Sequence, residues 1–110
     1  MNKPKALAAF QALSQDTRLD VFRLLMRSGP DGMAAGDIAQ ICGVRQNTMS
    51  SHLSLLAQAG LIASTRDGRT IRYHADLTGI QGLLAFLMEA CCGGNPELCQ
   101  PLIQQISCPC

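Results

Sequence analysis

The chain has 110 residues, a formal net charge of +1 and a hydrophobic content of 47%. This size and composition suit one globular domain, and no apolar run reaches the roughly 18 residues expected of a membrane span. Residues 1–5 lack the apolar stretch and cleavage site of a secretory signal, so we expect a cytoplasmic protein with no membrane partner.

Positive charge is concentrated in one part of the chain. Between residues 38 and 75 there are four arginines and a single acidic residue, Asp67, while the other acidic residues lie outside this segment. A basic segment within a nearly neutral protein is typical of a localised DNA-binding face.

The first third of the chain has helical periodicity. Apolar residues spaced three or four apart predict a helix over residues 6–13. Ser14 or Asp16 is expected to cap a second helix. Its apolar residues should make it largely buried: Leu19, Val21, Phe22, Leu24, Leu25 and Met26. The glycine- and proline-rich segment 28–32 predicts that this helix ends in a turn.

Two short helices are expected next. The first runs from about Ala35 to Cys42 with Ile38 and Ile41 facing inward, and Gly43 ends it. The second begins near Gln46 and is terminated by Gly60, with a buried stripe of Met49, Leu53 and Leu56. Two short helices joined by a tight glycine-containing turn are the signature of a helix-turn-helix.

A β-hairpin and a last helix complete the pattern. Two β-prone runs, 61–66 and 69–74, flank Asp67-Gly68, which is a strong hairpin signal. An apolar helix opens near Thr78, and the tail after residue 96 is expected to be irregular or a single weak turn. The predicted fold is therefore mainly α with a two-stranded β wing, a winged helix-turn-helix.

The last helix is too apolar to remain exposed on a monomer. Gly79 and Gly82 each cost a helix about 1 kcal/mol relative to alanine, which a close backbone approach would offset. We expect a homodimer through the terminal helices, including Leu7 and Phe10 of the first, although packing within one subunit is the alternative. A two-fold dimer would read two DNA half-sites about one turn or more apart.

The expected partner is double-stranded operator DNA. Asparagine and glutamine suit adenine edges, serine and threonine suit bases or phosphates, and wing arginines suit phosphates or the minor groove. There are alternatives to DNA contact for some of these residues. His52 could pack locally, and the wing arginines could simply be exposed to solvent. If each subunit neutralises about three phosphates, the salt slope is about −5. The candidate DNA-binding residues are Gln46, Asn47, Thr48, Ser50, Ser51, His52, Ser54, Arg66, Arg69 and Arg72.

Five of the six cysteines fall in the last 20 residues. Clustered thiols in a reducing compartment bind a metal or sense redox state more often than they form structural disulfides. Residues 1–90 are therefore expected to form the DNA-binding and dimerisation domain, and 91–110 a cysteine-rich tail. Cys42 falls in the apolar rhythm of its helix and is expected to belong to the core.

The sequence resembles the ArsR/SmtB family of winged-helix metal-sensing repressors from Leu13 to Leu87. The segments that carry the resemblance are 13–19, 50–62 through the second short helix, and 66–73 in the wing. The best-known arsenic site of the family resembles Cys-Val-Cys-Asp, but the matching segment 34–37 has no thiol. The family's zinc site on the last helix is also absent, because this helix has no histidine.

The remaining candidate is Cys91-Cys92 followed by Cys99, which is similar to a less common arsenical-sensor arrangement. As(III) and Sb(III) are thiophilic, and soft thiolates select such ions. The resemblance implies a repressor that leaves its operator when As(III) or Sb(III) binds these three cysteines, without an organic cofactor.

Several alternatives remain open. Cys108 and Cys110 are extra ligands or tail residues, and four thiolates would favour Cd or Zn, in a sensor or in a structural module. A repressor that responds to thiol oxidation is a second possibility. A thiol enzyme is not expected, because a helix C-terminus disfavours the reactive thiolate.

Overall fold

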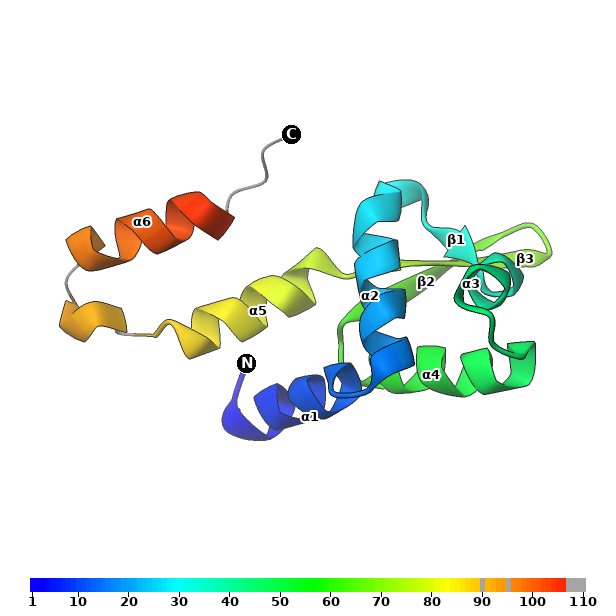
Figure 1. Cartoon of the computed structure of the whole chain (residues 1–110), viewed down its shortest axis with the longest axis horizontal. Coiled ribbons are helices and arrows are strands. Elements are labelled where there is room, and N and C mark those ends of the chain that lie inside the picture. Colours follow the sequence, from blue (N-terminus) through cyan, green and yellow to red (C-terminus); the bar gives the residue numbers. More distant parts are fainter. Residues whose placement is uncertain (90, 95, 107–110) are drawn as a thin grey trace.

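The computed structural model describes residues 1–89, 91–94 and 96–106 (Figure 1). Six α-helices, two short 3-10 turns and three strands follow one another along this part of the chain. In order they are α1 (Lys3–Leu13), α2 (Asp16–Ser28), η1 (Gly29–Asp31), β1 (Met33–Ala34), α3 (Ala35–Cys42), α4 (Gln46–Gln58), β2 (Ile62–Asp67), β3 (Thr70–Ala75), α5 (Leu77–Leu87), η2 (Cys91–Gly94) and α6 (Pro96–Ile106).

Helix α1 packs inward through alanines. Ala6, Ala9 and Ala12 are buried, whereas Leu7 and Phe10 are exposed, at 53% and 41%. Small residues on the inner face allow α1 to lie close to α2 and α4. The large apolar side chains of α1 are therefore presented to the outside.

Helix α2 begins differently from our expectation. Gln15, and not Ser14 or Asp16, is the cap, because its backbone is extended and its side chain accepts a hydrogen bond from the Arg18 amide at 2.8 Å. Val21, Phe22 and Leu25 are buried as we expected, whereas the expectation was wrong for Leu19 and Met26, which are both 43% exposed.

The core lies between α2, the helix-turn-helix and the sheet. The largest fully buried side chains are Leu25, Ile38, Met49, Leu53, Leu56, Leu61 and Val21, which confirms the predicted stripe of the second short helix. Helices α3 and α4 pack against each other and have the predicted bounds. Ile41 is 61% exposed, so its expected inward orientation was wrong.

The sheet has three strands in the order β1-β3-β2, and not the two that we expected. Strand β1 is only two residues long and pairs with the middle of β3, Met33 opposite Tyr73. Such a short strand has no periodicity that a sequence can reveal. It fastens the wing to the helix-turn-helix immediately before α3.

The hairpin turn is displaced by one residue from the predicted one. Asp67 pairs with Thr70, so the central residues of the turn are Gly68 and Arg69. Gly68 has φ +63°, as the first central position of a two-residue hairpin turn, type I′ or II′, requires. Asp67 thereby stays in the strand, where a residue with a Cβ fits better than at a positive-φ position.

Helix α5 begins at the end of the wing. Asp76 caps it, and the Asp76 amide donates to the Leu61 carbonyl at 2.9 Å. Gly79 lies against the Gly60 carbonyl, so closely that a Cβ there would overlap the oxygen. Close backbone approach thus explains Gly79, and it occurs within one subunit.

Helices α5 and α6 project from the rest of the molecule (Figure 1). Only Leu83 of α5 is buried, and α6 follows η2 directly along the chain. The expectation of an irregular tail was wrong, because Pro96 occupies the first position of a helix, where its missing N–H is not needed. None of the described helices is long and apolar enough to cross a membrane.

Candidate nucleic-acid interface and cysteine segment

Helix α4 presents an uncharged polar surface. Gln46, Asn47, Thr48, Ser50, Ser51 and Ser54 are all exposed, as a DNA-reading surface requires. The Ser50 hydroxyl donates to the Gln46 carbonyl at 3.0 Å, and Ser54 Oγ accepts from the Gln58 amide. Hydroxyls that bond to their own helix can exchange these partners for base edges or phosphates.

His52 differs from its neighbours on α4. It is only partly exposed, and its Nδ1 lies 3.4 Å from Nη1 of Arg18 at the start of α2. The geometry therefore resembles the local packing that we considered as the alternative for His52. Its role in DNA binding stays a prediction.

The wing separates its three arginines. Arg66 and Arg69 are exposed, Arg66 paired with Ile71 in the hairpin and Arg69 in the turn. Arg72 pairs with Thr65, and its guanidinium donates to the Asp31 and Gly32 carbonyls, both at 2.9 Å. Arg72 thus ties the wing to η1, and its side chain is less free than those of the exposed Arg66 and Arg69.

Two further arginines were absent from our candidate residues. Arg45 is exposed and precedes the first turn of α4, next to the polar surface. Arg18 joins α1 to α4 through hydrogen bonds. The local basic charge was a signal for Arg45. Arg18 lies in segment 13–19, which carries the family resemblance, but that pattern does not reveal its contact with His52.

The cysteine segment follows α5. Cys91 and Cys92 lie in η2, and Cys99 is the fourth residue of α6, which follows η2 directly along the chain. The backbone therefore brings the two parts of the proposed ligand set to neighbouring elements. The side chains of these cysteines, and the whole of Cys108 and Cys110, lie outside the described residues.

Cys42 is separate from this segment. It is partly buried and packs against the core, in line with the role that we expected for it. Burial, and after it the carboxylate of Asp20, raises the pKa of the Cys42 thiol. A thiol held in its neutral form is a poor ligand for a soft ion.

Comparison with known proteins identifies the helix-turn-helix. A helix-turn-helix domain model matches residues 13–65. The HTH-type transcriptional regulator YgaV of Escherichia coli is 33% identical over 88 residues, which are 80% of this chain and 87% of YgaV. The transcriptional repressor SdpR of Bacillus subtilis is 34% identical over 81% of this chain and 96% of SdpR.

Solved structures agree with this similarity. An ArsR-like transcriptional regulator from Rhodococcus sp. RHA1 has a TM-score of 0.72 and 26% identity, and the match covers 97% of this chain and 96% of that one. A structure described as a possible transcriptional regulator for arsenical resistance has a TM-score of 0.62 and 28% identity, over 70% and 77% of the two chains.

One more relative concerns a soft metal. A protein of Streptomyces lividans named as a probable mercury resistance operon repressor is 31% identical over 64 residues, which are 58% of this chain and 49% of that protein.

Proposed function

Because the chain belongs to the ArsR family of winged helix-turn-helix transcriptional repressors, we propose that its homodimer binds operator DNA and that As(III) or Sb(III) releases it. The observation that carries this proposal is the arrangement of three parts in one chain. An exposed polar helix and wing can read DNA, an apolar helix α5 can join two subunits, and thiols follow that helix directly.

The reading head is α4 together with the wing. Its exposed amides and hydroxyls suit base edges in the major groove, and Arg66 and Arg69 suit phosphates or the minor groove. Since α4 contains no lysine or arginine, affinity depends on the wing and on two heads acting together.

The dimer interface is α5 with α1. Leu7, Phe10, Leu77, Leu84 and Leu87 are all exposed in the single subunit, Leu87 at 54%. Soluble monomers rarely expose so many large apolar side chains on two neighbouring helices. A second copy of the chain would bury them.

The inducer site is the set Cys91, Cys92 and Cys99. Three thiolates are the donor set that a thiophilic trivalent ion prefers, and η2 and α6 are neighbouring elements. The similarity to regulators of arsenical and mercury resistance favours a thiophilic inducer. Bound at this place, the ion would hold η2 and α6 together.

The link to the reading head is the start of α5. Asp76 bonds to Leu61, and Gly79 touches Gly60, immediately after α4 ends. A change in the position of α5 is therefore transmitted to the end of α4. A nearly complete switch between bound and released states needs about 5.5 kcal/mol of differential affinity.

The test is arsenite titration of the DNA complex, using a duplex that the wild-type protein has selected from a random library. We expect release of the wild type, and no release of Cys91→Ser or Cys99→Ser at the same arsenite concentration. Cys42→Ser is the matched control and should respond like the wild type. DNA affinity that does not change on adding arsenite to the wild type would refute the arsenic response.

Two alternative inducers are distinguished by the same assay. Release by peroxide with little effect of arsenite indicates a redox repressor. Release by Cd or Zn that is lost in a chain ending at residue 107 indicates a four-thiolate site that includes Cys108 or Cys110.

A further inference from the structure

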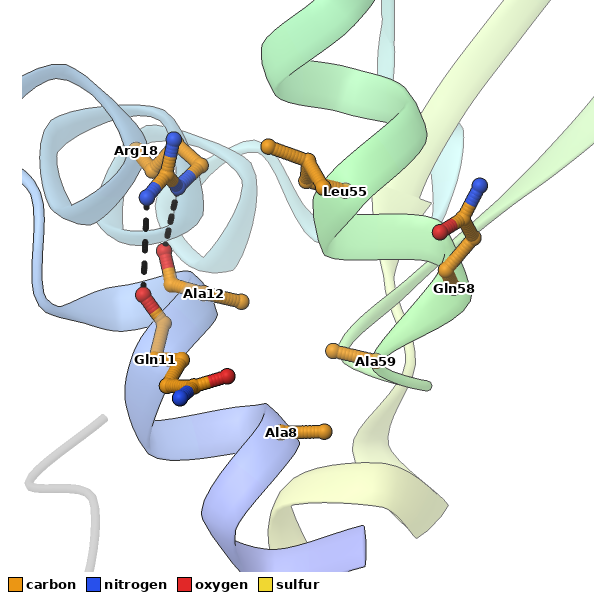
Figure 2. A pocket seen from close by; sticks show the side chains of 7 residues that line it. All are labelled: Ala8, Gln11, Ala12, Arg18, Leu55, Gln58 and Ala59. Atoms are coloured by element: carbon orange, nitrogen blue, oxygen red, sulfur yellow. Dashed lines mark hydrogen bonds between the residues drawn. The ribbon is translucent and has the colours of Figure 1, made fainter.

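Arg18 occupies a junction between three helices. From the first turn of α2, its Nε donates to the Ala12 carbonyl at 2.7 Å and its Nη2 to the Gln11 carbonyl at 3.4 Å, both at the end of α1. Figure 2 shows these two bonds. Its Nη1 lies 3.4 Å from Nδ1 of His52 in α4.

The chemistry of the pair sets the direction of this contact. A guanidinium has only donors, so the contact is a hydrogen bond in the tautomer in which Nδ1 of His52 accepts. Arg18 therefore donates at once to the carbonyl end of one helix and to a side chain of another. Hydrogen bonds from a charged donor are stronger than those between neutral groups.

A cleft beside Arg18 bears on how firmly the contacts of Arg18 hold α1 and α4 relative to each other. A surface cleft of about 440 Å³ lies between α1 and the second half of α4, to one side of their buried contact, and Arg18 lies at its edge (Figure 2). Because side chains do not fill this cleft, apolar packing constrains the two helices less here than in the core. The lining residues are Ala8, Gln11, Ala12, Leu55, Gln58 and Ala59.

We propose that Arg18 is a positioning residue for DNA binding, which acts through His52. The link fixes the rotation of α4 relative to α1, the helix that carries Leu7 and Phe10 to the second subunit. His52 follows Thr48 by one helical turn and is flanked by Ser51, so its attachment orients the exposed polar surface of α4. The inference rests on the proposed function, because it requires a DNA-binding dimer.

Two simpler roles make different predictions. If Arg18 only caps α1, its loss affects stability but not the DNA affinity of the folded protein. If His52 contacts DNA directly, the effects of changing His52 and Arg18 are independent. A double-mutant cycle distinguishes a shared link from independent roles.

The experiment measures the dissociation constant for a selected duplex of about 30 base pairs, long enough for two half-sites. The proteins are the full-length wild type, Arg18→Gln, His52→Leu, the double variant and His52→Asn. Thermal unfolding and sedimentation give the folded and dimeric fractions. Asparagine at 52 keeps an acceptor close to the position of Nδ1.

We expect each single variant to weaken binding about tenfold, which is about 1.4 kcal/mol, and the double variant to be no weaker than either. His52→Asn should stay within about threefold of the wild type. If Arg18→Gln does not fold, His52→Leu against His52→Asn still tests the link, because the Arg18 bonds to α1 remain.

The proposal is overturned by a double variant about a hundredfold weaker than the wild type, since the two effects are then additive. It is also overturned if single variants with full folded and dimeric fractions bind like the wild type, or if His52→Asn binds no better than His52→Leu. A wild-type protein that selects no duplex refutes the proposed function as well. Selection by the wild type followed by additive effects refutes only the role of Arg18.

Discussion

Gly79→Ala tests how closely α5 is held against the end of α4. The new methyl group would overlap the Gly60 carbonyl oxygen and lie 2.9 Å from its carbon, against the 3.5–4.0 Å of ordinary carbon contacts. Overpacking costs about 1–3 kcal/mol, and a backbone neighbour that cannot change rotamer favours the upper end. Alanine gains about 1 kcal/mol of helix propensity, so the net loss of stability is about 2 kcal/mol.

Gly82→Ala is the matched control in the same helix. A Cβ there lies 3.7 Å from the Met1 side chain, an ordinary contact, so only the gain in helix propensity of about 1 kcal/mol remains. For a domain near 100 residues, each kcal/mol shifts the unfolding midpoint by about 4 °C.

The assay is thermal unfolding followed by circular dichroism, at one protein concentration because dimers unfold in a concentration-dependent way. We expect Gly79→Ala to unfold about 8 °C below the wild type and Gly82→Ala about 4 °C above it. Equal midpoints for the two variants would show that the contact between Gly79 and Gly60 does not hold α5 in place.

Three further predictions concern the wing and its connections. Arg72→Leu should lower the free energy of unfolding by about 1–2 kcal/mol, because the ties to η1 are lost, whereas the exposed Arg66→Leu stays within about 0.5 kcal/mol in urea titrations. The hydrogen bond from Thr78 holds the pKa of Asp76 below its ordinary value, so this carboxylate stabilises the fold above about pH 4 and does so less as the pH falls further. Asp76→Asn should keep the helix cap but lose this pH dependence of stability in acid unfolding experiments. With Arg72 engaged, a dimer that neutralises about four phosphates has a salt slope of about −4 in DNA titrations, and a measured slope of about −6 or steeper would contradict this.

The helix-turn-helix was predictable from the sequence because its signals are local. Gly43 ends α3 in a left-handed conformation, and Met49, Leu53 and Leu56 recur at helical spacing, so the bounds of both helices followed from residues inside them. Ile41 follows the same spacing, but the neighbours of α3 leave it exposed. Periodicity gives a helix its faces and does not decide which of them is covered.

Other parts depend on tertiary contacts. The short strand β1 exists because β3 pairs with it, and the turn register follows from the full pairing of β2 with β3. In α1 the alanines are buried and the larger residues exposed, the reverse of a simple reading of hydrophobicity. The tail after residue 96 was expected to be irregular or a single weak turn, although proline also begins helices, as Pro96 does here.

Most residues of the candidate site could be predicted from the sequence, but which of them are engaged in contacts within the fold could not. Exposure of the α4 polar residues follows from the buried stripe on the opposite face. The engagement of Arg72 with residues about 40 positions earlier, and of Arg18 with His52, is set by the fold and leaves no local pattern.

The position of η2 and α6 after the last helix of the winged domain has a consequence for how such regulators diversify. Among the described residues, the elements that carry Cys91, Cys92 and Cys99 make most of their contacts with each other, so we expect substitutions there to leave the helix-turn-helix core and the wing unchanged. With the inducer bound in this segment, as we propose, new ligand preferences could arise there while the same DNA sequence continues to be recognised. On this proposal the fold separates the evolution of what is sensed from the evolution of which gene is controlled.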